Sequence, residues 1–408
     1  MKRFMRLFLL TLFVLQFATF WPQIRAWAED EIKIGCLLPE TGSLGWIKVA
    51  YSGIDLAVKE INDAGGPLGR KIVTVRRDTG SVADQSRKGM EDLIYNIKVP
   101  AVIGPTSATI LEVLDIAQKE HVVEISPTAG TTKLDTIGGK WVFRTTSSDK
   151  VMGLGIAVEA MILGFKKAAV FCANTGSGTS MAGAVKPHFT RLGGRITEEI
   201  IFEEGKSSYR EELKRLFKGR PDVIFFEASP PEGKIIFKEW NEMGLGGTWI
   251  GTDFFNEEFV EKVSAVANIE GLMSVRPSPA PSERLERWKR DLNALTGAEG
   301  IPAFSAQAYD AVNLIALAIE AAGQATGEGI ASKLRMVGDP PGREVYNFAE
   351  GARLLRRGED IDYIGVAGKI EFDEYGDVMV DHQVNQVKRG KLVQIGVLTQ
   401  DELAQYAK

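Results

Sequence analysis

The alternation of short apolar runs with amphipathic segments is the feature that most constrains how this chain can fold. Between Trp46 and Asn62 apolar residues recur at helical spacing, and Lys71–Arg77 then has the pattern of a strand. The same order repeats through the predicted helix Asp84–Ile97 and the run Ala101–Ile103, which suits a strand covered on both faces. Strands separated by helices predict parallel sheets, so we expect an α/β fold.

The alternation starts again after Trp141–Thr145, a predicted strand that has no strong turn signal behind it and therefore suggests a crossing between lobes. Further strands are predicted at Lys167–Cys172, Arg195–Phe202, Pro221–Glu227, Thr248–Thr252 and Gly271–Val275, and helices at Ser282–Leu295 and Phe304–Ala322. The proline-rich segment Pro277–Pro281 marks a second boundary. We expect the stretch from Gly338 to Ile364 to be mostly loop, and the chain to end in a hairpin around Arg389-Gly390. Two runs of this kind in 408 residues predict two doubly wound lobes joined by several crossings.

Two loops follow predicted strands of the first run and carry hydroxyl-bearing residues. Ala101–Ile103 leads through Gly104-Pro105 to Ser107, which we expect to cap a helix that starts there. The second loop is Ser126–Thr131. Since ligands collect at the carboxyl edge of parallel strands and helix N-termini attract anions, we interpret the loops as two walls of a small-molecule pocket. The alternative, that each loop is an ordinary connection, stays open.

The N-terminus has the pattern of a signal peptide over residues 1–28, with cationic residues before an apolar core and the small-x-small motif Ala26-Trp27-Ala28. Cleavage after Ala28 would leave an exported, periplasmic protein; an uncleaved anchor is the alternative. The leader carries four of the 49 basic residues and none of the 54 acidic ones, so the mature chain has a net charge near −9. This balance argues against nucleic acid or an anionic membrane as partner.

The rarer residue types indicate neither a metal site nor a cofactor. Cys36 and Cys172 are the only cysteines and end predicted strands of different lobes, so we expect two buried free thiols. Three scattered histidines form no metal-binding pattern. The sequence has no Gly-x-Ser-x-Gly motif, P-loop or dinucleotide fingerprint, and we therefore predict that the protein is not an enzyme and has no cofactor.

With these segments in order, the chain resembles the periplasmic substrate-binding proteins of ABC importers, of the branched-chain amino-acid (leucine/isoleucine/valine) type. The resemblance spans residues 31–398. The segments that carry it are Ile32–Gly35, Thr41-Gly42, Ala57–Gly66, Val102–Ser107, Ile125–Ala129, Phe143–Thr145, Leu192–Gly194, Pro221–Val223, Ile250–Asp253 and Ala308–Ala311. It implies a type I fold in which two α/β lobes, joined by a three-crossing hinge, close over a ligand. The crossings would lie near Thr145–Ser147, Ser274–Pro277 and Glu371–Tyr375. The first lobe would then comprise 29–146 plus 277–371, and the second 147–276 plus 372–408.

The resemblance also implies a binding site for an amino acid. Ser107 and the segment Thr128, Ala129, Gly130 and Thr131 match positions that hold the carboxylate, Trp46 an aromatic wall, and Asp253 the acidic partner of the ammonium group. Donors at one end and an anion at the other are what a zwitterion needs. Trp46 as helix-start packing, Ser107 as a cap only and Asp253 as a turn residue are the alternatives.

The chain departs from the family at three places in this site. Ser177 and Ser229 stand where the family has tyrosines, and the loop Ser-Pro-Thr-Ala-Gly-Thr moves the last hydroxyl by one position. A roomier and more polar second wall follows, which leaves the ligand's identity open; the two serines could also be loop residues without a part in affinity.

We therefore expect an extracytoplasmic solute-binding protein that captures an amino acid or related small carboxylate and delivers it to an ABC permease, as a monomer. The alternative is a ligand-sensing input for a chemoreceptor or sensor kinase. In both, binding energy would stabilise the closed form.

Overall fold

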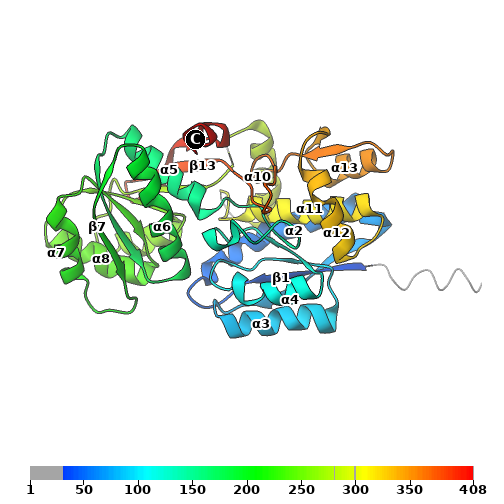
Figure 1. The fold of residues 1–408 in the computed structure, drawn as a ribbon, viewed down its shortest axis with the longest axis horizontal. Coiled ribbons are helices and arrows are strands. Elements are labelled where there is room, and N and C mark those ends of the chain that lie inside the picture. Colours follow the sequence, from blue (N-terminus) through cyan, green and yellow to red (C-terminus); the bar gives the residue numbers. More distant parts are fainter. Residues whose placement is uncertain (1–30, 280, 298–299, 408) are drawn as a thin grey trace, which may run out of the picture.

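The computed structural model describes residues 31–279, 281–297 and 300–407. The predicted signal peptide and its cleavage after Ala28 lie outside these residues. The described chain forms two α/β bodies side by side, each around its own sheet, with the C-terminal helix near their junction (Figure 1). We call the body around sheet A the first lobe and the body around sheet B the second lobe.

Sheet A is a parallel sheet whose described strands run in the order β2-β1-β3-β4-β5. Their bounds are β1 (Glu31–Leu38), β2 (Lys71–Asp78), β3 (Ala101–Ile103), β4 (Val123–Ser126) and β5 (Val142–Arg144). In a doubly wound sheet of this order the ligand crevice lies at the switch point, here outside the carboxyl ends of β1 and β3.

Sheet B repeats the same order in its parallel part, β7-β6-β8-β9-β10, and then adds the antiparallel hairpin β13-β14 beside β10. The bounds are β6 (Lys167–Ala173), β7 (Arg195–Phe202), β8 (Val223–Glu227), β9 (Thr248–Gly251), β10 (Met273–Pro277), β13 (His382–Lys388) and β14 (Lys391–Leu398). The expected hairpin at Arg389-Gly390 is confirmed.

The helices of the first lobe pack on both faces of sheet A. Its helical segments are η2 (Gly45–Ala50), α2 (Tyr51–Asp63), η3 (Pro67–Gly69), α3 (Ala83–Glu91), η4 (Asp92–Ile97), η5 (Ile110–Glu112), α4 (Leu114–Lys119), η6 (Thr132–Leu134), α10 (Glu283–Thr296), α11 (Ser305–Ala322), α12 (Gly327–Gly338) and α13 (Phe348–Leu355). Gly53 of α2 is needed for the close packing on α11, because a Cβ there would lie 1.8 Å from the Ser305 carbonyl oxygen. The main core cluster joins α2, α10 and α11 to strands of sheet A.

The helices of the second lobe cover sheet B with two separate clusters, one on each face. They are α5 (Asp149–Ile162), α6 (Gly176–Arg191), α7 (Arg210–Leu216), η7 (Phe217–Gly219), α8 (Pro230–Glu242), α9 (Glu257–Ser264) and α14 (Gln400–Ala407). Cys36 in β1 and Cys172 in β6 are buried free thiols in different sheets, as expected.

The described chain passes between the lobes three times: after β5 into α5, after β10 into α10, and before β13. The predicted α/β fold with two doubly wound lobes is therefore confirmed. The boundary expected after residue 371 stays a prediction. Val378 and Val380 pack in the first lobe's main cluster, which favours a third crossing nearer to His382.

Two predicted helices begin differently in the structure. No helix starts at Ser107: residues 107–109 form a turn, followed by η5 and the short α4. The reason is that Ser107 Oγ accepts a hydrogen bond from Thr131 N, and both Thr109 N and Ile110 N bond to the Thr106 carbonyl oxygen. The helix expected from Trp46 is a 3₁₀ segment as far as Ala50 and becomes α-helical only from Tyr51.

The expectation of a loop over 338–364 is wrong. This stretch contains α13 and the parallel pair β11 (Arg343–Val345) and β12 (Ile361–Tyr363). Asn347 caps α13 by accepting a hydrogen bond from Glu350 N at 2.9 Å. Phe348, Ala352 and Leu354 are buried in the first lobe's core, and this burial outweighs the turn signal of Pro340-Pro341-Gly342.

Candidate functional site

A cavity of about 230 Å³ lies between the two lobes, at the carboxyl ends of their parallel strands. Seven of the nine residues predicted for the site line it: Trp46, Ser107, Thr128, Gly130, Ser177, Ser229 and Asp253. The other two, Ala129 and Thr131, are buried outside this lining. Their part in ligand binding, like that of the seven, stays a prediction.

The first-lobe wall is a pair of loops held together by hydroxyl groups. Ser126 Oγ donates to the Pro105 carbonyl oxygen at 2.5 Å and accepts a hydrogen bond from Ala129 N at 2.9 Å. Thr131 N donates to Ser107 Oγ at 3.1 Å. The N–H groups of Ala129 and Thr131 therefore shape the wall.

Two threonine hydroxyls in this wall lack a hydrogen-bond partner among the described residues. Thr106 Oγ1 and Thr128 Oγ1 are buried and, within the described chain, have no hydrogen-bond partner. Both residues line the cavity. Since buried polar groups in native proteins are nearly always paired, these hydroxyls are candidates for hydrogen bonds to a bound molecule or an ordered water. Sequence reasoning missed Thr106, although it precedes Ser107 in the same turn.

Aromatic side chains from three segments form the apolar part of the cavity. Trp46 makes an edge-on contact with Phe254 of the second lobe, at 5.8 Å between ring centroids, and a tilted contact with Phe304 at 6.1 Å. All three residues line the cavity. Phe254 directly follows Asp253 and Phe304 directly precedes α11, so the sequence carried no periodic signal for either.

The second-lobe wall brings acidic and hydroxyl groups to the ends of β8 and β9. Asp253 and Ser229 follow these strands, and Ser177 lies in the first turn of α6, where Thr175 Oγ1 caps the helix by accepting from Gly178 N at 3.0 Å. Asp149, the first residue of α5, also lines the cavity and is only 3% exposed. Sequence reasoning missed Asp149.

Burial shifts the acid–base behaviour of this wall. It raises the pKa of Asp253 to about 6 and that of Asp149 to about 7, with the charge of Asp253 adding to the shift of Asp149. The pKa of Glu227, buried at the end of β8, rises to about 8 for the same reason and because Asp253 and Asp149 repel its charged form. The three carboxyl groups therefore influence one another and share one electrostatic environment.

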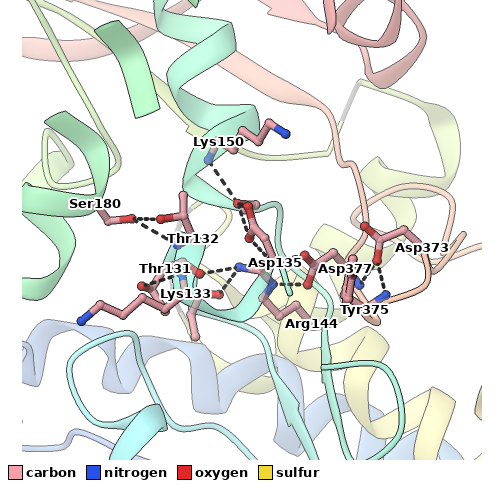
Figure 2. A network of polar contacts seen from close by, with 12 residues as sticks. Thr131, Thr132, Lys133, Asp135, Arg144, Lys150, Ser180, Asp373, Tyr375 and Asp377 are labelled. Carbon is pink, nitrogen blue, oxygen red and sulfur yellow. Dashed lines mark hydrogen bonds and ion pairs between the residues drawn. The ribbon is translucent and has the colours of Figure 1, made fainter. Parts of the chain in front are cut away.

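A buried arginine ties the first-lobe wall to two crossings (Figure 2). Arg144 Nε donates to Asp377 Oδ1 at 2.6 Å, on the segment before β13, and its guanidinium also pairs with Asp135 at 2.7 Å. A further bond runs from Arg144 to the Thr131 carbonyl oxygen at 3.1 Å, and Ser148 Oγ, at the N-cap of α5, donates to Asp135 at 2.8 Å. The loop, the first crossing and the third crossing thus share one network.

The lobes also touch directly beside this network. Thr132 N donates to Ser180 Oγ of α6 at 3.2 Å, a bond between the first-lobe loop and the second lobe (Figure 2). Together with the contact between Trp46 and Phe254, it links the two lobes directly. A two-lobed body with a cavity of this size at its junction is typical of proteins that bind a small molecule.

The comparison with known families agrees with this geometry. The profile of a family described as periplasmic binding protein matches residues 31–353. The chain belongs to the periplasmic binding protein family. Across the described residues of this family member, no helix combines the length and apolar character that a membrane crossing requires. Nor do those residues hold a group of three or more His, Cys, Asp or Glu side chains that could bind a metal ion.

Individual relatives cover most of this periplasmic binding protein. It is 28% identical over 318 residues to a Leu/Ile/Val-binding protein of Rhizobium johnstonii, covering 76% of this chain and 84% of the relative. It is 22% identical over 373 residues to a chemotactic signal transduction system substrate-binding protein of Halobacterium salinarum, covering 88% of each. The crystal structure of a leucine binding protein from Thermotoga maritima superposes with a TM-score of 0.77 at 26% identity, covering 91% of this chain and 99% of that one. The type I periplasmic binding protein fold is thus confirmed.

Proposed function

We propose that this periplasmic binding protein captures an amino acid between its lobes and delivers it to an ABC permease in the membrane. The observation that carries the proposal is the interlobe cavity. One wall has hydroxyls without a partner in the described part of the chain, the other has Asp253, and aromatic rings lie between them. A zwitterion would place its carboxylate at the hydroxyls of Thr106, Ser107 and Thr128 and its ammonium group at Asp253. Leu/Ile/Val-binding relatives support the ligand class.

The proposal also covers the width of the cavity, the location of the protein and its oligomeric state. Ser177 and Ser229, which line the cavity where aromatic walls were expected from the family, widen the second wall and leave room for a polar side chain. Export to the periplasm through a leader cleaved after Ala28, and a monomeric working state, complete the proposal.

The experiment is calorimetry of the purified protein, without its leader, against single amino acids and small organic acids. We expect at least one amino acid to bind, and X-ray scattering to show a smaller radius of gyration for the bound protein, because closure is coupled to binding. Failure of every amino acid to bind would refute the proposed ligand class. An unchanged radius on saturation would refute hinge closure.

A sensory role is the second candidate, favoured by the resemblance to the chemotactic substrate-binding protein. Both roles need the same closed form, so the ligand alone does not separate them. Cross-linking of the ligand-bound protein in membranes, followed by identification of the partner, does: a permease supports transport and a chemoreceptor supports sensing.

A further inference from the structure

The charged residues of the cavity are all acidic. Among the described residues that line it, the ionisable ones are Asp149, Glu204 and Asp253, and none is a lysine, arginine or histidine. They come from separate segments, namely α5, the loop after β7 and the loop after β9. A neutral zwitterion brings one ammonium group, which can neutralise only one of the three carboxylates.

The two cations whose charge reaches Asp149 and Asp253 have ion-pair partners elsewhere in the protein. Arg144, whose charge reaches Asp149, is bound to Asp377 and Asp135. Arg276, whose charge reaches Asp253, pairs with both carboxylate oxygens of Glu257, at 3.1 and 2.9 Å. The two arginines therefore offset the negative charge of these acids only in part.

Independent evidence for a ligand group comes from atoms without partners. Asp149 Oδ2 and Glu227 Oε1 are buried oxygens without a partner in the described chain, although the Ser180 side chain interacts with the carboxyl group of Asp149 and the Thr252 side chain with that of Glu227. Glu227 sits next to the cavity wall, where the side chain of Ser177 bonds to it. On the opposite wall Thr106 Oγ1, in a residue 2% exposed, is likewise unpaired in the described residues. Buried acceptors near one end and a buried hydroxyl at the other are complementary to a ligand with cationic and anionic ends.

Building on the proposed function, we propose that the ligand is a basic amino acid, with its carboxylate on the hydroxyl wall and its two cationic groups divided among Asp149, Glu204 and Asp253. The aliphatic stem of such a ligand lies against Trp46, Phe254 and Phe304, whose rings also attract a neighbouring cation. A neutral aliphatic amino acid would leave the buried Asp149 carboxylate without a counter-charge, and an aromatic acid would bring a further anion beside it.

The test measures dissociation constants by calorimetry for lysine, arginine and ornithine, and for leucine as the neutral competitor. We expect the best basic amino acid to bind about 30-fold or more tightly than leucine. Thermal unfolding first establishes that the Asp149→Asn variant is folded. In that variant the ratio of the dissociation constants for leucine and the basic amino acid should fall about tenfold. Glu204 is exposed, so Glu204→Gln is a second variant that does not threaten folding, and it should also reduce the preference. Glu261→Gln, on the exposed face of α9 and outside the cavity lining, is the matched control and should preserve it.

The outcomes separate this inference from the proposed function. Leucine binding as tightly as lysine, or unchanged preference in both Asp149→Asn and Glu204→Gln, overturns the basic ligand and leaves amino-acid capture standing. 1,5-Diaminopentane binding as tightly as lysine overturns the assignment of the carboxylate to the hydroxyl wall. Failure of all amino acids, basic and neutral, refutes the proposed function itself.

Discussion

The backbone N–H of Asp149 donates a hydrogen bond to the Gly130 carbonyl oxygen at 2.6 Å, and the two residues lie so close that a Cβ on Gly130 would stand 2.0 Å from Asp149 Oδ1. Gly130 belongs to the first-lobe loop and Asp149 begins the first helix of the second lobe. The cavity wall and the first crossing are therefore fixed to each other at this point, and only glycine fits there without movement.

Gly130→Ala should accordingly displace the Asp149 side chain or, where that side chain is held in place, the loop. Overpacking of this kind costs about 1–3 kcal/mol of unfolding free energy. Thermal unfolding and calorimetry should show lower stability together with weaker ligand binding. Gly183→Ala is the control, because Gly183 lies on α6 with open space around its Cβ position. Alanine in a helix interior is favoured over glycine, so the control should be neutral or slightly stabilising. Equal stability of Gly130→Ala and the wild type would contradict the close contact.

The sequence predicted the order of strands well, because buried parallel strands such as Ala101–Ile103 and Val223–Glu227 are continuous apolar runs between turn residues. It predicted less well where tertiary contacts replace local signals. Ser107 has the character of a helix cap, but its Oγ accepts a hydrogen bond from the backbone N–H of Thr131, which lies 24 residues away. Phe254, Phe304 and Asp149 reach the cavity only through the packing of the lobes, and no local pattern distinguishes them from residues of a loop or helix end.

Asp253→Asn should weaken amino-acid binding by about 2–5 kcal/mol, since it removes the charged partner of an ammonium group in a desolvated site. Calorimetry with the ligand found for the wild type measures the change. The control is Asp401→Asn, an exposed carboxylate in α14 that lies outside the cavity lining. Equal affinity in Asp253→Asn and the wild type would remove Asp253 from the site.

Trp46 should report ligand binding by fluorescence, because it lines the cavity and contacts Phe254 across the lobes. We expect a ligand-dependent change in emission in the wild type that is lost in Trp46→Phe. Trp141→Phe should keep the change, because Trp141 does not line the cavity. Its ring stacks on that of His121, with 4.7 Å between the ring centroids. A full response that persists in Trp46→Phe would show that Trp46 stands apart from the ligand.

The three acidic groups of the second-lobe wall predict how pH acts on the ligand-free protein. Their pKa values of about 6, 7 and 8 for Asp253, Asp149 and Glu227 lie above those of unfolded carboxyl groups, so the folded state binds more protons. Their contribution to stability is therefore complete below about pH 4 and is lost as pH rises through 6 to 8. The cations Arg144 and Arg276 reduce the shifts of Asp149 and Asp253. Unfolding measured from pH 5 to 8.5 should show this loss, and Asp149→Asn should lessen it.

A cationic ligand acts on the same groups in the opposite direction. It favours their ionised forms, so binding should strengthen as pH rises through 6 to 8 and should release protons. Calorimetry in phosphate and in Tris at one pH measures the released protons from the difference in apparent enthalpy. Identical enthalpies in the two buffers would show that the acids keep their protonation state on binding.

Substitution of Arg144 tests whether its network with Asp135 and Asp377 keeps the cavity wall in place. Arg144 is fully buried, and its loss leaves Asp135 and Asp377 facing each other without a counter-charge. Breaking a buried ion pair in this way costs about 3–5 kcal/mol, so Arg144→Met should lower the denaturant midpoint strongly. Arg353→Met, at an exposed position of α13, is the matched control and should change stability by less than about 0.5 kcal/mol. Because Arg144 also holds the Thr131 carbonyl oxygen, ligand affinity should fall in the folded variant at low temperature. Lower stability with wild-type affinity would mean that the network supports the fold and not the cavity wall.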